Sequence, residues 1–314
     1  MHNPGKKISI VIPIYNEEKV IPELIKELAR FAAKLPLYQC EFILVENGSH
    51  DLSLQLLDKY ARRDTRLKIV QLSRNFGCDG GIVAGMSYAT GDACVIMMAD
   101  LQEPISLIKE FIATWEKGYD IVYGIVQKRQ GKFLRNVASK FFYKLINLLA
   151  PTKFPENASD FRLIDKKVYQ TINHMPEQNK YLRGLIMWTG FRHIGIPFDR
   201  KKRFAGESKA DLKTVIYVAL NGIFSFSYLP LRLVSYLGLV LTIVSFALGL
   251  FYLLLFFIHG RVAPGVVTII LITLFLFGVL FFILGIISEY IARIYEEVKQ
   301  RPNFIVKKTV NINP

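Results

Sequence analysis

Charged side chains are missing from two long stretches near the C-terminal end of this 314-residue chain. The first runs from Leu233 to Ile258 and the second from Val262 to Ser288, and each exceeds the roughly 20 apolar residues that a bilayer-crossing helix needs. A soluble domain of this size would hardly cover two such helices on all sides. The pattern therefore predicts a helical hairpin through a membrane.

Cysteine is also scarce, and its three copies, Cys40, Cys78 and Cys94, lack the spacing of a metal site. The five histidines form no ligand pair, so the sequence offers no zinc site. A signal-like apolar segment is missing from the N-terminus, where polar residues lead directly into a strand-like run. We therefore expect reduced thiols and an N-terminal region that stays in the cytosol.

Positive charge dominates the chain, with a formal net charge of +14, and gathers on both flanks of the expected hairpin. The short connection between the two apolar stretches carries only Arg261. The positive-inside rule then predicts that both termini lie in the cytosol. Anionic lipid headgroups would attract the basic flanks, and no nucleic-acid partner is expected because the basic residues follow the membrane boundary.

Strand-like and helix-like segments alternate through the first part of the chain. The expected strands are 8–15, 41–45, 67–72, 93–98 and 120–125, and the expected helices are 20–34, 52–61, 77–89 and 104–117. This alternation predicts an α/β fold with a mostly parallel sheet and helices on both faces. Ligands of such sheets bind at the carboxyl ends of the strands.

The alternation weakens after about residue 131. A helix is expected at 132–149, a short strand or turn at 160–165 and an edge strand at 192–197. The apolar segment 210–230 fits either amphipathic helices in the membrane interface or a core helix on the sheet. The expected organisation is a cytosolic domain at 1–209, interfacial helices at 210–231, two transmembrane helices at 232–292 and a cytosolic basic tail at 293–314.

Five motifs follow one another along the chain: Ser9–Glu18 (SIVIPIYNEE), Leu72–Gly77 (LSRNFG), Ala99–Pro104 (ADLQEP), Ser159–Leu163 (SDFRL) and Arg200–Lys209 (RKKRFAGESK). With the two apolar stretches, they resemble family-2 glycosyltransferases of the GT-A (Rossmann-like) fold, in particular bacterial polyprenyl-phosphate glycosyltransferases related to dolichol-phosphate mannose synthase. The resemblance runs nearly end to end. It implies inverting transfer of a sugar, with a UDP-hexose as the preferred donor, to undecaprenyl phosphate for cell-envelope glycans. It also implies a multi-pass protein of the bacterial inner membrane that forms a homo-oligomer, expected to be a tetramer.

The donor is expected at the ends of the first strands. The residues proposed to contact it are Pro13, Tyr15, Glu17, Glu46, Arg74 and Arg129. Pro13, Tyr15 and Glu17 would border the base and ribose, and Glu46 would accept hydrogen bonds from the base. Arg129 would add a cation beside the diphosphate.

Asp100 and Gln102 are the expected catalytic residues at the end of the fourth strand. Asp100 would hold Mg²⁺ or Mn²⁺ against the diphosphate, because hard carboxylate oxygens suit these cations. A turn-forming carboxylate is the alternative role for Asp100. Asp160 would steer the acceptor or complete the cation site, and a structural hydrogen bond is its alternative.

A lipid phosphate is already ionised at neutral pH, so it needs cations and geometry more than a strong base. Arg200, Arg203 and Lys209 come shortly before the membrane segment, where such a headgroup would arrive. Arginine suits phosphate because its guanidinium binds with two parallel hydrogen bonds. A solvated basic loop that only attracts headgroups is the alternative.

Three positions depart from the family pattern. Met98 replaces the first aspartate of the usual Asp-x-Asp, the second strand ends in Glu46-Asn47-Gly48 rather than an aspartate-rich turn, and the stretch 124–127 lacks the arginine that often follows the fifth strand. These changes leave the metal dependence open. A processive polysaccharide synthase is disfavoured because only two spans are expected. A non-catalytic membrane scaffold that kept the fold is the alternative from another class.

Overall fold

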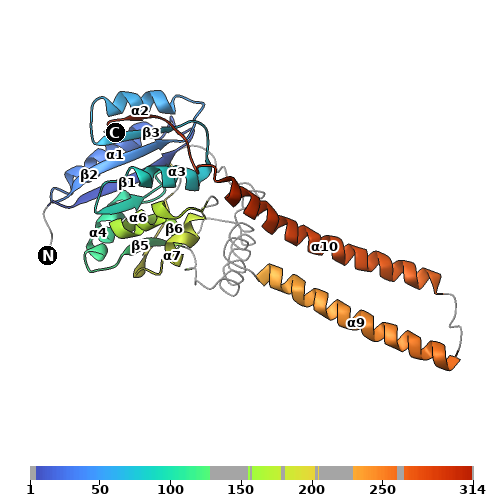
Figure 1. The fold of residues 1–314 in the computed structure, drawn as a ribbon. Helices are drawn as coiled ribbons and strands as arrows, with labels where there is room; N and C mark the ends of the chain where they lie inside the picture. The colour runs from blue at the N-terminus through green and yellow to red at the C-terminus, as the bar shows by residue number, and fades with distance from the viewer. Residues whose placement is uncertain are drawn as a thin grey trace.

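The computed structural model describes residues 5–127, 155, 158–177, 181–201, 204, 229–259 and 265–312 (Figure 1). The helix expected at 132–149 and nearly all of the interfacial segment 210–231 lie outside the described residues. The same holds for three expected site residues, Arg129, Arg203 and Lys209.

A mixed sheet with the order β7-β5-β6-β4-β1-β2-β3-β8 forms the centre of the first region. Its strands are β1 (Lys7–Ile14), β2 (Gln39–Glu46), β3 (Leu67–Leu72), β4 (Ala93–Ile96), β5 (Ile121–Val126), β6 (Ala158–Asp165), β7 (His193–Phe198) and β8 (Val306–Val310). β6 and β8 run antiparallel to their neighbours, and the other pairs are parallel. The expected mostly parallel sheet is confirmed.

Helices cover both faces of the sheet, as expected. One buried cluster includes residues of α1 (Ile21–Ala33), α2 (Ser53–Ala61) and α4 (Ile108–Trp115), which follows the short helix η1 (Ile105–Leu107). The other cluster includes residues of α3 (Gly77–Ser87), α6 (Lys166–His174) and α7 (Leu182–Trp188). Central parallel strands covered on both faces are apolar almost throughout, which is why they read as continuous runs.

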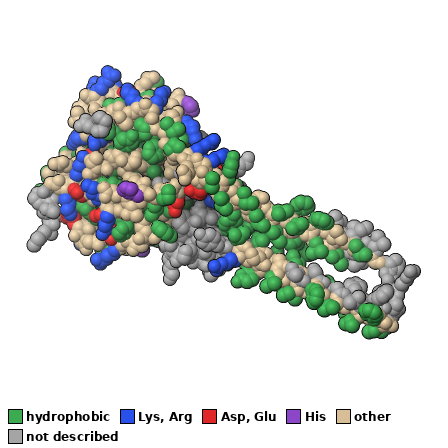
Figure 2. Space-filling model, viewed as in Figure 1, with side chains coloured by type: hydrophobic (Ala, Val, Ile, Leu, Met, Phe, Trp, Pro, Cys, Tyr) green, Lys and Arg blue, Asp and Glu red, His purple; other side chains and the backbone are tan. Residues whose placement is uncertain are grey.

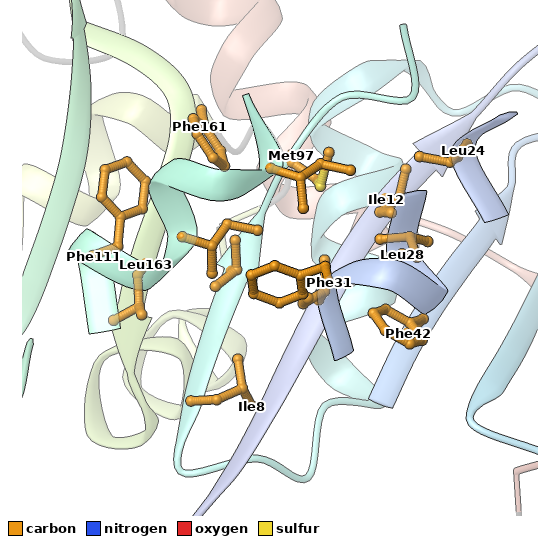
Figure 3. Close-up of a cluster of buried hydrophobic side chains, with 14 of the residues drawn as sticks. Ile8, Ile12, Leu24, Leu28, Phe31, Phe42, Met97, Phe111, Phe161 and Leu163 are labelled. Atoms are coloured by element: carbon orange, nitrogen blue, oxygen red, sulfur yellow. The ribbon is translucent and has the colours of Figure 1, made fainter. Parts of the chain in front are cut away.

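The packing of α1 shows how the sequence pattern produces this core. Leu24, Leu28 and Phe31 recur at helical spacing and are buried against the sheet. Ile8 and Ile12 lie in the same cluster, because alternate residues of a strand point to the same face (Figure 3).

The structure adds two antiparallel strands that the sequence pattern described incompletely. β6 lies inside the sheet between β4 and β5, although only a small strand or turn was expected at 160–165. Polar Ser159, Asp160 and Arg162 interrupt its apolar pattern, yet Phe161 and Leu163 are fully buried. These charged side chains belong to the candidate site. Because they interrupt the apolar pattern, the sequence did not indicate that β6 lies in the centre of the sheet.

The C-terminal segment differs from the basic tail expected at 293–314. α10 continues to Lys299, and Val306–Val310 then pairs with β3 as the edge strand β8. Ser73 N donates a hydrogen bond to Ile305 O at 2.9 Å, which ties this segment to the end of β3. The two lysines within β8 made this segment resemble a basic tail in the sequence. Lysine is also common in edge strands, where it discourages pairing with other chains.

Two long helices, α9 (Leu229–His259) and α10 (Val266–Lys299), extend away from the sheet region (Figure 1). Their windows Leu231–Leu248 and Phe275–Lys299 have mean hydropathies of 2.0 and 2.2, so both are long and apolar enough to cross a membrane. No part of either window is buried within the protein, and hydrophobic side chains cover both helices in Figure 2. The expected pair of apolar helices is confirmed.

Candidate active site

The turns after β1 and β2 are joined by hydrogen bonds at the carboxyl edge of the sheet. Asn16 N donates to Ser49 Oγ at 3.0 Å, and His50 N donates to Asn16 Oδ1 at 2.8 Å. Glu17 N donates to Ser53 Oγ at 3.0 Å. Asn16 has a positive φ of 52°, which asparagine tolerates better than most residues. These hydrogen bonds therefore hold the two turns together at this edge.

The turns after β2 and β3 are joined in a similar way. The buried Asn47 side chain accepts from Phe76 N at 3.0 Å and donates to Gly77 O at 2.8 Å. Gly48 has a φ of +71°, and a Cβ added there would lie 2.5 Å from the carbonyl carbon of Arg74. Only glycine permits this close approach of two backbones.

The expected donor residues that the structure describes lie in or beside these turns. Pro13 lies in the last part of β1 and Tyr15 directly after it, and the Tyr15 ring lies edge-on to His50 with centroids 6.5 Å apart. Glu46 is 2% exposed and its Oε1 accepts from Ser49 N at 2.5 Å, so its carboxylate also holds the turn. Arg74 is exposed and stacks over the ring of Phe76 at 4.1 Å.

Asp100 follows β4 on a tight turn and is 6% exposed. Its Oδ1 accepts from Gln102 N at 3.2 Å, and Leu101 between them has a positive φ of 56°. Glu103 lies beneath this turn, where Oε2 accepts from Met98 N at 3.0 Å and Oε1 accepts from Ser159 Oγ at 2.9 Å. Glu103 therefore connects the Asp100 turn to β6.

Burial raises the pKa of Glu103 to about 7. Its bonds to Met98 and Ser159 and the nearby charge of Arg200 oppose that rise, whereas Asp100 adds to it. A neutral carboxylic acid is favoured where a carboxylate would lose its hydration.

Lys201 and Phe204, two described residues of the basic segment 200–209, lie against the Asp100 turn. Lys201 N donates to Gln102 O at 2.9 Å, and Phe204 N approaches Asp100 O at 3.4 Å. Gln102 Nε2 in turn donates to Lys201 O at 3.4 Å. Sequence segments a hundred residues apart thus meet at one edge of the sheet.

Asp160 lies at the start of β6 with both carboxylate oxygens engaged. Arg183 Nε donates to Oδ1 and Arg183 Nη2 donates to Oδ2, each at 2.5 Å. Burial opposes ionisation, but the charges of Arg183, Arg162 and Arg200 outweigh it and lower the pKa of Asp160 to about 2. The structure thus brings Asp160, Arg200, Asp100 and Gln102 into one neighbourhood.

Met98 stands at the position of the first aspartate of the family's usual Asp-x-Asp, and its sulfur accepts a contact from the Cys78 thiol at 3.8 Å. Within the described residues, no group of three or more His, Cys, Asp and Glu side chains could hold a metal ion.

The sequence patterns assigned no role to three residues of this site. Glu103 stood inside the ADLQEP motif, Arg183 lies in an otherwise apolar helix, and Asp79 lies within a glycine-rich stretch. Burial raises the pKa of Asp79 to about 6, aided by the charge of Asp160 and opposed by Arg183. A charged residue within an apolar segment is the signal that would have pointed to Arg183.

Comparisons with known proteins were consistent with this geometry. The sequence matches the family described as Glycosyl transferase family 2 over residues 9–172, just over half of the chain. It is 42% identical over 302 residues to the uncharacterized glycosyltransferase sll0501 of Synechocystis sp., with 96% of this chain and 94% of that protein covered. It is 36% identical over 310 residues to the SfII prophage-derived bactoprenol glucosyl transferase of Shigella flexneri, with 98% and 100% covered. Among solved structures, mannosyl-3-phosphoglycerate synthase from Rubrobacter xylanophilus aligns with a TM-score of 0.50 at 13% identity, over 74% of this chain and 75% of that one, a likeness of fold alone.

Proposed function

The chain belongs to glycosyl transferase family 2 and is a glycosyltransferase, and we propose that it transfers a sugar from a nucleotide sugar to a polyprenyl phosphate. The alignment with a bactoprenol glucosyl transferase over nearly the full length of both chains supports this acceptor. A UDP-hexose is the proposed donor and undecaprenyl phosphate the proposed acceptor.

The contact between the basic segment and the Asp100 turn carries this proposal. The backbone bonds from Lys201 to Gln102 and from Phe204 to Asp100 join the two parts of the chain that we propose to bind the acceptor and the donor. Arg200 lies close enough to affect the ionisation of both Asp160 and Glu103. An anionic headgroup beside Arg200 would therefore reach a sugar diphosphate beside Asp100.

The proposed reaction is a single displacement. The lipid phosphate oxygen forms the new bond to the anomeric carbon, the bond to the donor diphosphate breaks, and the nucleoside diphosphate leaves with that electron pair. Attack comes from the face opposite the leaving group, so the anomeric carbon is inverted. The acceptor is already an anion, so orientation and electrostatic stabilisation do most of the catalytic work.

A divalent cation, Mg²⁺ or Mn²⁺, would neutralise the leaving diphosphate. Asp100 would hold it together with phosphate oxygens, because Mg²⁺ often takes only one or two protein carboxylates. With Met98 beside it, the site offers one acidic side chain fewer than an Asp-x-Asp turn. We therefore expect weaker metal binding than in a relative that has both aspartates.

We propose a membrane arrangement from α9 and α10. Both helices extend from the sheet region, which contains the first and the last strands, β1 and β8 (Figure 1). Two spans place the two termini on the same side, and the basic flanks favour the cytosolic face of the bacterial inner membrane. We also propose a homo-oligomer, with a tetramer as the expected state, which native mass spectrometry in detergent would measure.

A transfer assay tests the function. The purified protein is incubated with UDP-glucose or another UDP-hexose, undecaprenyl phosphate in detergent and Mg²⁺ or Mn²⁺, and the lipid product is identified by mass spectrometry. Asp100→Ala should lower kcat by at least roughly 100-fold, since it removes an electrostatic contact to the leaving group. Asp64→Ala is the matched control, because Asp64 pairs with Arg66 on the surface. An Asp100→Ala variant as active as the wild type would contradict the assigned role.

Met98→Asp separates a re-tuned enzyme from a non-catalytic scaffold. In the enzyme, this substitution should lower the Mg²⁺ concentration that gives half-maximal activity. A wild type that binds the nucleotide sugar but never transfers or hydrolyses it would favour the scaffold.

A further inference from the structure

The carboxylate of Asp160 is held in a fixed plane. Two parallel bonds from Arg183 engage both of its oxygens, and a bidentate guanidinium fixes orientation as well as position. The side chain of Asp160 is 22% exposed and that of Arg183 is 38% exposed, so the pair lies at the rim of the site rather than inside the core.

The helix that carries Arg183 is anchored on two sides. Leu182 and Ile186 of α7 are buried beneath the sheet face, and Arg183 is the one charged residue of this helix. Asp79, in the first turn of α3, accepts a hydrogen bond from the backbone of Leu182. Because α3 and α7 are joined here, the guanidinium has little freedom to follow a moving carboxylate.

The backbone behind Asp160 is held by another arginine. Arg162 is 4% exposed, and its Nη2 donates to Ser159 O at 2.8 Å while its Nε donates to Asp160 O at 3.3 Å. Ser159 Oγ donates to Glu103, which supports the Asp100 turn. Asp160 is thus connected through covalent neighbours and hydrogen bonds to the donor side of the site.

We propose that Arg183 is a positioning residue that fixes the Asp160 carboxylate as an oriented anion at the entrance for the acceptor phosphate. The inference rests on the proposed function. With both oxygens bound by Arg183, Asp160 is poorly placed to ligate a cation or to take a proton. Its fixed charge repels a phosphate that does not arrive beside Arg200, and so limits the directions of attack.

Arg183→Lys tests this directly, because lysine keeps the charge but loses the two-pronged geometry. We expect kcat to fall on the order of 100-fold, as misplacement of a reacting group by about 1 Å does. The KM for the nucleotide sugar should stay within about twofold, since the proposed donor residues lie at the ends of β1, β2, β3 and β4, whereas the guanidinium of Arg183 binds Asp160 of β6. The KM for the lipid phosphate should rise.

A double-mutant cycle distinguishes positioning from two separate effects. Asp160→Asn and Arg183→Gln are measured singly and together. If Arg183 acts through Asp160, the double variant is about as slow as the slower single variant. If the two losses in kcat multiply, Arg183 acts independently and the proposal is overturned.

Lys167→Gln is the matched control. Lys167 Nζ lies 2.7 Å from Asp120 Oδ1, an ion pair at the opposite edge of the same strands. It should leave kcat and both KM values unchanged. All rates are normalised to the concentration of donor-binding sites, so that unfolded protein does not lower the apparent kcat.

The outcomes separate this inference from the function on which it rests. An active wild type with an equally active Arg183→Lys variant overturns the inference alone. Variants that unfold while the folded fraction keeps the wild-type kcat assign the pair a structural role and also overturn it. A wild type that transfers no sugar to a polyprenyl phosphate overturns the proposed function and the inference together.

Discussion

The two edges of the sheet each hold a carboxylate whose pKa is lowered to about 2, yet the two are built differently. At the amino edge, Glu41 is 2% exposed and receives bonds from Lys7 and Lys68 at 2.7 Å and from Thr90 N at 2.8 Å. At the carboxyl edge, Asp160 is paired with a partly exposed arginine.

Burial opposes the ionisation of Glu41, but the bonds from Lys68, Lys7, Ser9 and Thr90 outweigh it. Every one of these partners is supplied by neighbouring strands or their connections. The carboxyl-edge cluster lies beside a basic segment and a second perturbed acid, Glu103. A lowered pKa by itself therefore does not mark a functional site, and the two carboxylates are distinguished by the groups that surround them.

The largest predicted effect is on the free energy of unfolding and comes from replacing Glu41 at the amino edge. Glu41→Ala leaves two lysines without their partner, and the free energy of unfolding should fall by about 4 kcal/mol. Below the melting transition, kcat and KM should equal the wild-type values. Thermal unfolding in detergent and the transfer assay measure both quantities. A loss of kcat in fully folded Glu41→Ala protein would remove the distinction between the two edges.

Glu27→Ala is the control for this change. Glu27 pairs with Arg30 at 2.6 Å on the exposed face of α1. Because exposed ion pairs contribute little, its unfolding free energy should change by less than about 1 kcal/mol.

The pH dependence of stability tests the buried acid beneath the Asp100 turn. The pKa of Glu103 is about 7 in the folded protein against 4.5 for the ordinary group, so the folded state binds more protons between these values. Stability should therefore fall as pH rises from about 4.5 to 7, by about 3 kcal/mol, and then level off. Glu103→Gln should flatten this part of the profile. A wild-type profile that is already flat would contradict the assignment.

The acid side of the same profile has the opposite sign. Asp160 and Glu41 have lowered pKa values, so they stabilise the fold above about pH 4, and this contribution is lost as pH falls through 2. Asp160→Asn and Glu41→Ala should each reduce that acid-side loss.

Substitutions of two glycines in the turns after β2 and β3 distinguish the effect of close packing from that of backbone strain. Gly48 and Gly77 both have a positive φ, but an added Cβ would be crowded only at Gly48. Gly48→Ala should cost about 2–3 kcal/mol and weaken donor binding, whereas Gly77→Ala should cost about 1 kcal/mol. Chemical unfolding and titration with UDP measure both. Equal costs would show that the contact between Gly48 and Arg74 contributes nothing.

A further test concerns Asn47, an uncharged residue of the carboxyl edge. Asn47→Ala removes the bonds to Phe76 N and Gly77 O and should cost about 1–2 kcal/mol. The free energy of UDP binding should change more than the free energy of unfolding, because both partners lie in the turn that follows β3. Unchanged UDP affinity would indicate that this turn does not contact the donor.

Much of the site was predictable because strand ends of a parallel sheet meet at one edge. Once 8–15, 41–45, 67–72 and 93–98 were assigned as strands, Tyr15, Glu46, Arg74 and Asp100 had to lie along the same edge. The partners of the charged residues were not predictable. Arg183 lies 23 residues from Asp160, and Ser159 lies 56 residues from Glu103, separations that no local period relates.

By itself, the sequence determined the α/β class, the two apolar helices and the order of the strand-end motifs. These depend on local composition and on periods of two or 3.6 residues, and both can be read directly from the order of residues along the chain. Only the tertiary structure decided that β6 enters the sheet, that the C-terminal segment pairs with β3 as β8 and that Arg183 binds Asp160. Each of these is a long-range contact, chosen by how buried surfaces fit together rather than by any neighbour along the chain.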